Sequence, residues 1–311
     1  MGDRLKGRNA VVTGSGSGVG KAIAIALATE GANIIICDIG GSIKGEGSST
    51  TLADETVAEC QKLGVQAIPQ YGSVAEWDAA EAMIKACVDN FGKIDILVNV
   101  AGIDRARMIW NLTEEDWDSV VGVHLKGTFN TSRHAAPLMR EQRSGRIINT
   151  ISEAFVGTVG HCNYGAAKGG IAALTYAVAW ELGKYGVTCN AFCPRAATRM
   201  TMGPEVIEGY KKRVASGLWT QERFEEATHV PSADYMAAIP VFLCTDEAAD
   251  INGCIFGASG ANFSYWTPSY ESAMYARDWD TYGPWTVEEV RKLAPNILKG
   301  YVNPAPAEEK K

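Results

Sequence analysis

The 311-residue chain has no excess of positive charge, since 29 Lys and Arg residues stand against 36 Asp and Glu residues. The formal net charge is −7 at pH 7, and this disfavours a protein that binds nucleic acid through its phosphate backbone, which requires a basic face. No apolar stretch approaches the roughly 20 residues of a membrane-spanning helix, and the first residues contain no apolar signal core. We therefore expect a cytoplasmic protein with neither a nucleic-acid partner nor a membrane partner.

Paired metal-ligand and redox motifs are also missing. None of the eight cysteines has C-x-x-C spacing, and most lie in apolar runs, so buried reduced thiols are favoured over disulfides or metal ligands. His134, His161 and His229 are scattered along the chain without H-E-x-x-H spacing, so we expect no metal site. His161 and Cys162, which precede a tyrosine considered below, are expected to line the substrate pocket.

Short β-rich runs alternate with longer amphipathic stretches along most of the chain. Residues 33–38 form a continuous apolar run, as expected for a parallel strand covered on both faces. Repeated βα units predict an α/β protein with a single Rossmann-type, doubly wound parallel sheet. The predicted strands are 9–13, 33–38, 66–70, 94–99, 146–151, 187–192 and 253–256. The predicted helices are 18–30, 52–63, 75–91, a long helical region up to about residue 140, 163–185 and 233–243.

Two segments interrupt this alternation. Residues 40–51 are rich in Gly and Ser, which predicts a loop inserted into the second βα unit. We expect residues 1–260 to form one domain, which holds all the motifs described below, and residues 261–311 to form a C-terminal extension. The extension is rich in aromatic residues that require burial, so it is expected to pack on its own domain or on a neighbouring subunit. Residues 304–311 are expected to be disordered. The aromatic residues concerned are Tyr265, Trp266, Tyr270, Tyr275, Trp279, Tyr282, Trp285 and Tyr301.

A glycine-rich turn, Thr-Gly-Ser-Gly-Ser-Gly-Val-Gly at residues 13–20, separates the first predicted strand from the first predicted helix. Glycines permit a tight turn and let the backbone approach a pyrophosphate, which the N-terminus of the following helix attracts. The turn is therefore predicted to bind a dinucleotide. The residues expected to contact it here are Gly14, Ser17, Gly18, Val19 and Gly20.

Asp38 closes the second predicted strand. A carboxylate at this position can accept hydrogen bonds from both hydroxyls of an adenosine ribose and would repel a 2′-phosphate. Positions 17 and 39 hold Ser17 and Ile39 rather than an Arg or Lys that could neutralise that phosphate. These features favour NAD over NADP as the cofactor. The alternative is a surface Asp that only caps a loop.

Tyr164 and Lys168 are four residues apart and therefore share one face of a predicted helix. A phenol titrates at about 10, and a nearby ammonium lowers that value, so Tyr164 is a candidate acid–base group. Ser152, at the end of the preceding strand, offers a hydroxyl that can polarise a substrate carbonyl oxygen. A lone Tyr/Lys pair at this spacing is common on helix surfaces and decides little by itself.

The combined order of these motifs resembles the short-chain dehydrogenase/reductase family over roughly the first 260 residues. The motifs are TGxxxGxG, an Asp at a strand end, Asn-x-Ala-Gly at residues 99–102, Ser, and Tyr-x-x-x-Lys. The resemblance implies that Tyr164 donates or accepts the proton, that Lys168 binds the nicotinamide ribose, and that Ser152 orients the substrate. It also implies a homodimer or homotetramer built through two long helices, near residues 116–139 and 163–185. Further cofactor contacts are expected from Ile39, Ser73, Val74, Asn99, Ala101, Gly102 and Pro194.

A finer resemblance points to one branch of the family. Residues 116–118, 123–129 and 199–201, the inserted loop and the aromatic segment are similar to the (3R)-hydroxyacyl-CoA dehydrogenase part of multifunctional enzyme type 2 and its bacterial relatives. His124 replaces the Asn usual in the family, and it could relay a proton or merely hydrogen-bond the kinked backbone. Gly72 replaces an acid that often contacts adenine. Arg195 follows Pro194 in place of the usual Gly and could bind an anionic substrate group or remain a solvated charge.

The sequence therefore predicts an NAD-dependent oxidoreductase that moves a hydride between the nicotinamide and a secondary alcohol or ketone. A 3-hydroxyacyl-CoA is the first choice of substrate, and Met200, Met202 and Trp219 suggest an apolar substrate or are simply part of the core. The alternatives are a dehydrogenase of a free cyclic, steroidal or aromatic alcohol, or a catalytically silent nucleotide-binding subunit. The intact set of Ser152, Tyr164 and Lys168 argues against the silent subunit.

Overall fold

The computed structural model describes residues 2–259, 262–268, 274, 276, 278–282 and 284–299. The chain divides into two compact units, Met1–Trp266 and Thr267–Lys311. The second unit contains the short helix α11 (Trp279–Tyr282) and the helix α12 (Val287–Ile297), which begins with a capping box at Thr286. Several residues named in the sequence analysis lie outside the described part of the chain. They are Tyr270, Tyr275 and Tyr301, the side chains of Trp279 and Tyr282, and the predicted tail 304–311.

An eight-stranded sheet forms the centre of the first unit, in the order β3-β2-β1-β4-β5-β6-β7-β8. The first seven strands are parallel, and β8 pairs with β7 in the antiparallel direction. The chain leaves β1 toward β2 on one side and returns to β4 on the other, which creates the topological switch point where such sheets bind ligands. The strands are β1 (Asn9–Thr13), β2 (Asn33–Cys37), β3 (Ala67–Gln70), β4 (Ile96–Asn99), β5 (Gly145–Thr150), β6 (Val187–Pro194), β7 (Ile255–Ser259) and β8 (Asn262–Trp266).

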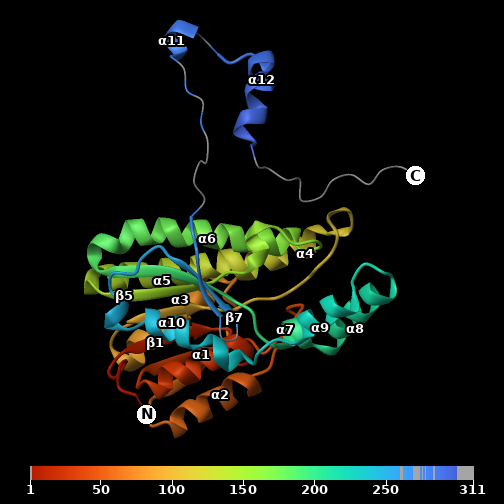
Figure 1. The fold of residues 1–311 in the computed structure, drawn as a ribbon. Coiled ribbons are helices and arrows are strands. Elements are labelled where there is room, and N and C mark those ends of the chain that lie inside the picture. Colours follow the sequence, from red (N-terminus) through yellow and green to blue (C-terminus); the bar gives the residue numbers. More distant parts are fainter. Residues whose placement is uncertain are drawn as a thin grey trace. The chain divides into compact units, whose positions relative to one another are not determined.

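Helices cover both faces of the sheet (Figure 1). On one face α1 (Gly18–Thr29), α2 (Thr51–Lys62) and α10 (Ala238–Leu243) bury one hydrophobic cluster. On the other face α3 (Trp77–Phe91), α5 (Gly127–Gln142) and α6 (Cys162–Leu182) bury a second. Strands covered on both sides must be apolar throughout, which explains the continuous run Ile34–Ile36. The predicted doubly wound Rossmann-type fold is thus confirmed.

The helix α4 (Glu114–Val121) continues into α5 through a π-helical segment, Gly122–Lys126. Thr113 caps α4, since its side chain accepts a hydrogen bond from the backbone N–H of Asp116. A π-helical segment inside a helix often marks a functional site, and His124 lies within this one.

Several elements differ from the sequence-based prediction. The helices α7 (Arg199–Met202), α8 (Pro204–Ala215) and α9 (Gln221–Thr228) were not predicted, nor was β8. Because β8 belongs to the sheet, the first compact unit ends at Trp266, whose ring packs against Phe155 with centroids 5.2 Å apart. The short 3₁₀ helices are Ile109–Asn111, Glu153–Val156, Gly183–Tyr185, Ala233–Met236 and Asp246–Ala248.

All eight cysteines are free thiols. Six are buried as expected, whereas Cys254 is half-buried and Cys162 is exposed. Within the described residues, no helix combines the length and apolarity that a membrane crossing requires. The same part of the chain holds no group of three or more His, Cys, Asp or Glu side chains placed to bind a metal ion.

Candidate active site

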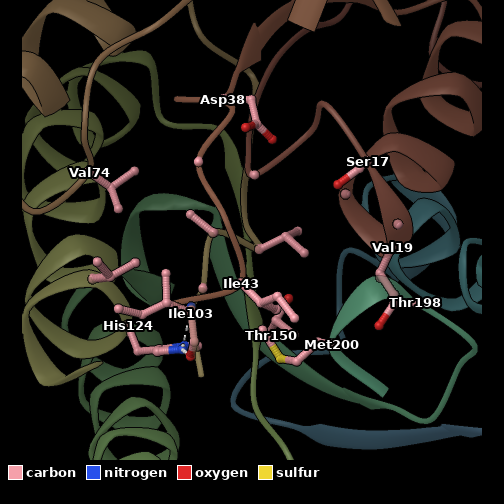
Figure 2. Close-up of a pocket in the computed structure, with 18 of the residues that line it drawn as sticks. Ser17, Val19, Asp38, Ile43, Val74, Ile103, His124, Thr150, Thr198 and Met200 are labelled. Carbon is pink, nitrogen blue, oxygen red and sulfur yellow. Dashed lines mark hydrogen bonds between the residues drawn. The ribbon is translucent and has the colours of Figure 1, made fainter. Parts of the chain in front are cut away.

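One cleft, with a cavity volume of about 290 Å³, opens at the carboxyl ends of the parallel strands. Figure 2 shows Ser17 and Asp38 at one end of this cleft and His124, Ile103 and Met200 at the other. Most residues singled out from the sequence line it together. They are Gly14, Ser17, Gly18, Val19, Gly20, Asp38, Ile39, Ser73, Val74, Ala101, Gly102, His124, Tyr164, Lys168 and Pro194.

The glycine-rich turn requires glycine for steric reasons at two positions. A Cβ on Gly14, where φ is +64°, would lie 2.7 Å from the Ala101 Cα, and a Cβ on Gly20 would lie 2.1 Å from the Gly14 carbonyl oxygen. The N-terminus of α1 has neither an acidic residue in its first turn nor a side chain bonded as a cap. Its free N–H groups and dipole therefore suit a phosphate group, so the turn fits the pyrophosphate of a dinucleotide.

Asp38 directs its carboxylate toward this turn. Its Oδ2 accepts a hydrogen bond from the Gly16 N–H at 2.8 Å, and its Oδ1 accepts one from the Gly40 N–H at 2.7 Å. A guanidinium N–H of Arg199 donates to the Ser17 hydroxyl at 3.1 Å. The carboxylate is held by backbone on both sides and faces the cleft beside the N-terminus of α1.

Tyr164 and Lys168 lie on α6 at the base of the cleft. The Lys168 Nζ is 5.5 Å from the Tyr164 ring centroid and donates to the Thr150 carbonyl oxygen at 2.6 Å. Burial lowers the pKa of Lys168 to about 7 and raises the pKa of Tyr164 above its usual value. A hydrogen bond from Ser152 opposes this rise in the pKa of Tyr164. The expected decrease in the pKa of Tyr164 is therefore not found in this structure, because burial is the largest influence on that pKa and raises it.

Two predicted site residues are not among those lining the cleft. Asn99 is buried, and its side chain bonds to Asn149, Ser132 and Thr131, so it supports the strand end from inside. Ser152 caps a 3₁₀ helix through the Ala154 N–H at 3.3 Å and reaches the Tyr164 hydroxyl from outside the cleft lining.

His124 lies beside Tyr164, with ring centroids 5.0 Å apart and the planes nearly perpendicular. Its Nε2 is 2.8 Å from the Ile103 carbonyl oxygen and 3.0 Å from the Ile103 nitrogen. Burial lowers the pKa of His124 to about 3, with a further decrease from Lys168. The imidazole is therefore neutral at ordinary pH.

Comparison with known proteins identifies the family. The family model described as short chain dehydrogenase matches residues 8–206. The chain is a short-chain dehydrogenase/reductase. It is 34% identical to the hydroxyacyl-CoA dehydrogenase ChsB1 of Mycobacterium tuberculosis, over 90% of this chain and 86% of that protein. It is 35% identical to mouse peroxisomal multifunctional enzyme type 2, over 93% of this chain but only 36% of that longer protein. A crystal structure of a short chain dehydrogenase from Mycobacterium avium covers 97% of this chain and 98% of its own, with 36% identity and a TM-score of 0.79.

This dehydrogenase/reductase carries site residues that the sequence did not reveal. Ile43, on the inserted loop, lines the cleft together with Ile103, Thr150, Thr198 and Arg199. The loop is anchored because the Asp104 N–H donates to the Ile43 carbonyl oxygen at 2.8 Å and the Arg105 Nε donates to the Lys44 carbonyl oxygen at 2.9 Å. The Gly/Ser-rich interruption of the second βα unit was the only sequence signal for this loop. It predicted that a loop is present but not that the loop lies over the cleft.

The structure also shows the surroundings of Gly72, Arg195 and His161, which the sequence analysis singled out. A Cβ on Gly72 would lie 2.8 Å from the Ala79 Cβ, so the cleft wall has no room for a side chain there. Arg195 is exposed and donates to the Glu226 carbonyl oxygen at 3.4 Å, which agrees with a solvated charge. His161, expected to line the substrate pocket, lies outside this cleft lining, although its ring is 5.9 Å from the Tyr164 ring.

Proposed function

We propose that this dehydrogenase/reductase uses NAD and moves a hydride between the nicotinamide and a secondary alcohol or its ketone. The observation that carries the proposal is that one cleft is lined by the glycine-rich turn and Asp38 at one end and by Tyr164 and Lys168 at the other. Such an arrangement suits a dinucleotide whose adenosine half lies at Asp38 and whose nicotinamide half lies beside Tyr164.

The preference for NAD rests on Asp38. A carboxylate accepts hydrogen bonds from ribose hydroxyls and repels a 2′-phosphate. Neither Ser17 nor Ile39 supplies a cation to offset that repulsion. Arg199, whose guanidinium bonds to Ser17, lies over the N-terminus of α1 and so suits the pyrophosphate.

In alcohol oxidation, the Tyr164 phenolate takes the proton of the substrate hydroxyl and becomes the phenol, and in ketone reduction the phenol returns that proton to the substrate oxygen. Ser152 holds the substrate oxygen and hydrogen-bonds to Tyr164. Lys168, which donates to the Thr150 carbonyl oxygen, would hold the cofactor ribose and provides a second proton-carrying group near Tyr164. The nicotinamide supplies the hydride chemistry when bound.

The substrate class we propose is a 3-hydroxyacyl thioester such as a 3-hydroxyacyl-CoA. Two similar proteins have names that refer to hydroxyacyl-CoA dehydrogenation or to a peroxisomal multifunctional enzyme. In this chain, Ile43, Ile103 and Met200 give one end of the cleft an apolar wall, as an acyl chain requires. A free cyclic, steroidal or aromatic alcohol fits the same wall and is the second candidate.

We also propose a homodimer or homotetramer built through α4–α5 and α6. The Trp180 side chain on α6 is 81% exposed and Phe129 on α5 is 44% exposed. Large apolar side chains on neighbouring helices are typical of an interface between subunits. We assign catalysis to the compact unit that ends at Trp266.

The deciding experiment compares the wild-type protein with Tyr164→Phe. Purified protein is incubated with NAD and a panel of 3-hydroxyacyl-CoAs and free secondary alcohols, and NADH formation is followed by absorbance. We expect turnover with a 3-hydroxyacyl-CoA and a loss of about 10²–10⁴-fold in kcat for Tyr164→Phe, with NADH binding retained. Full turnover by Tyr164→Phe would refute the role of Tyr164. Turnover only with free alcohols selects the second substrate class, and no turnover with any member of the panel favours a catalytically silent subunit.

A further inference from the structure

Two loops that are distant in sequence meet beside Tyr164. A parallel bridge joins Arg107, in the loop after β4, to His161, the residue that precedes α6. The buried Asn163 side chain fixes this contact, since its amide donates to the Arg105 carbonyl oxygen at 3.2 Å and to the Asp116 carbonyl oxygen at 3.1 Å. Both loops are therefore held rigidly against the start of the helix that carries Tyr164.

The contact brings an acid and a base together. The His161 Nε2 lies 3.6 Å from the Asp104 Oδ2, and its Nδ1 lies 3.2 Å from the Val159 carbonyl oxygen. Both ring nitrogens thus face acceptors, and only the doubly protonated imidazolium can donate to both. Consistently, the contact with the Asp104 carboxylate raises the pKa of His161. Each of the two side chains is about one quarter exposed.

Tyr164 lies against this pair. The His161 and Tyr164 rings are 5.9 Å apart at their centroids and nearly perpendicular. The Asp104 carboxylate raises the pKa of the phenol, and its influence ranks below those of burial and of the Ser152 hydrogen bond. The Asp104 Oδ1 is buried and has no hydrogen-bond partner within the described part of the chain.

Other charged groups near the pair are accounted for. The nearest guanidinium groups on the same loop face other acids, since Arg107 pairs with Asp116 at 2.7 Å and Arg105 with Glu115 at 2.8 Å. Arg213, on α8, lowers the pKa of His161. On the other sides, Tyr164 is faced by Lys168 on α6, by the neutral His124, and by the Cys193 thiol on β6, which is protonated because burial raises its pKa to about 12.

We propose that Asp104 and His161 tune Tyr164 electrostatically: the Asp104 carboxylate opposes formation of the phenolate, and the His161 imidazolium cancels that opposition. Both are positioning residues that act through Tyr164, so the proposal rests on the proton-transfer role of Tyr164 given above. With both members charged, the pair adds no net charge beside the phenol. With His161 neutral, one negative charge remains and the phenolate forms less readily.

The pH dependence of alcohol oxidation tests this proposal. The probe reaction is the oxidation of 3-hydroxyoctanoyl-CoA by NAD, and kcat/KM is measured between pH 5.5 and 10 for wild type, His161→Gln, and the double variant His161→Gln/Asp104→Asn. Loss of the imidazolium leaves Asp104 uncompensated, so His161→Gln should move the acid limb to higher pH by roughly one unit. The double variant should return it to the wild-type position, because it again has no net charge.

A second readout does not depend on turnover. The chain contains four histidines, so the proton NMR titration of the ring C–H of His161 can be assigned from the signal lost in His161→Gln. Asp104→Asn should lower the pKa of His161. The exposed His229 provides a matched control, since His229→Gln should change neither the acid limb nor the titration of His161.

The outcomes separate this proposal from the proposed function. An acid limb that stays in place in His161→Gln, or one that moves but is not restored by Asp104→Asn, overturns the tuning role even if Tyr164→Phe is inactive. Full turnover by Tyr164→Phe instead overturns the proposed function, and with it any route by which the pair could act. An unchanged pKa of His161 in Asp104→Asn also contradicts the proposed pairing.

Discussion

The His124 Nε2 lies 2.8 Å from the Ile103 carbonyl oxygen, so a π-helical segment and the loop after β4 are tied together directly beside Tyr164. The same nitrogen lies 3.0 Å from the Ile103 N–H, so in either tautomer one of the two Ile103 backbone groups can hydrogen-bond to the ring. The buried Nδ1 has no hydrogen-bond partner among the described residues. A neutral histidine that bonds the backbone corresponds to one of the two roles the sequence left open. Relay through an imidazolium is disfavoured, because burial lowers the pKa of His124 to about 3.

The buried His124 should make the protein less stable in mild acid. Its pKa is lowered to about 3 in the folded chain, against about 6.5 for an unfolded chain. Between these values the unfolded state binds a proton that the folded state does not, so the free energy of unfolding falls as pH falls. From pH 7 to pH 5 this group alone should lower it by roughly 2 kcal/mol.

Urea denaturation at pH 7 and pH 5 measures this effect. His124→Asn, which has no titratable group, should show a smaller loss of stability on acidification than wild type. His229→Gln, at an exposed position, should keep the wild-type loss. An equal loss in His124→Asn and wild type would contradict a buried, neutral His124.

Gly102 should not tolerate a side chain, because it faces the His124 ring. A Cβ on Gly102 would lie 2.3 Å from the His124 Cε1, and the bond to Ile103 prevents the ring from moving away. We expect Gly102→Ala to destabilise the protein by about 1–3 kcal/mol and to reduce turnover. Thermal denaturation and the NADH assay measure both effects.

A matched glycine provides the control for this prediction. Gly122 lies in the π-helical segment that contains His124, with φ of −59°, and a Cβ there would meet nothing within 4 Å. Gly122→Ala should therefore be neutral or stabilise by up to about 1 kcal/mol. Adding His124→Asn to Gly102→Ala should recover part of the loss, since the clash is with the ring. Independent, additive effects of the two substitutions would argue against this contact.

The order of the parallel strands and their covering helices could be predicted because buried strands are apolar throughout. The run 33–38 and the helix 163–185 were predicted to within a few residues of β2 and α6. The helices α8 and α9 were missed because neither contains a buried residue, so neither leaves a clear apolar stripe. Strand β8 was missed because four of its five residues are exposed and pairing with β7 at the edge of the sheet holds it.

The candidate site, like the fold, could be predicted only where a local sequence pattern determines the structure. Positions fixed by local geometry, such as Gly14, Gly20 and Asp38, could be read from the sequence. The meeting of Asp104 with His161 depends on a bridge between distant loops, and no local pattern encodes it. The pKa of Tyr164 was predicted with the wrong sign, because the sequence shows which charge lies nearby but not how completely the phenol is buried.

Asp38 should set the choice between the two nicotinamide dinucleotides. Asp38→Asn keeps the size of the side chain but removes the negative charge, so the ribose loses charge-assisted hydrogen bonds and a 2′-phosphate is no longer repelled. We expect NADH affinity to fall by about 10-fold or more and NADPH affinity to rise or stay constant. Fluorescence titration of both cofactors measures the ratio of dissociation constants.

The control is a carboxylate outside the cleft. Asp54, on α2, is exposed and accepts a hydrogen bond from the Tyr71 hydroxyl at 2.6 Å, so Asp54→Asn should leave the ratio unchanged. Tighter binding of NADPH than NADH by wild type, or equal weakening of both cofactors in Asp38→Asn, would remove the role assigned to Asp38.

Trp180 provides the test of the proposed assembly. Its side chain on α6 is 81% exposed in the single chain, and leaving an indole in water forgoes a large apolar burial. If α6 packs against its copy in a second subunit, Trp180→Glu places a charge in that interface and should weaken association by several kcal/mol. Size-exclusion chromatography with light scattering at micromolar concentration should then show a dimer or tetramer for wild type and a smaller species for the variant.

Leu218, 77% exposed on the turn between α8 and α9, is the matched control, and Leu218→Glu should keep the wild-type mass. A monomeric wild-type protein, or a variant of unchanged mass, would mean that this face of α6 does not form the interface.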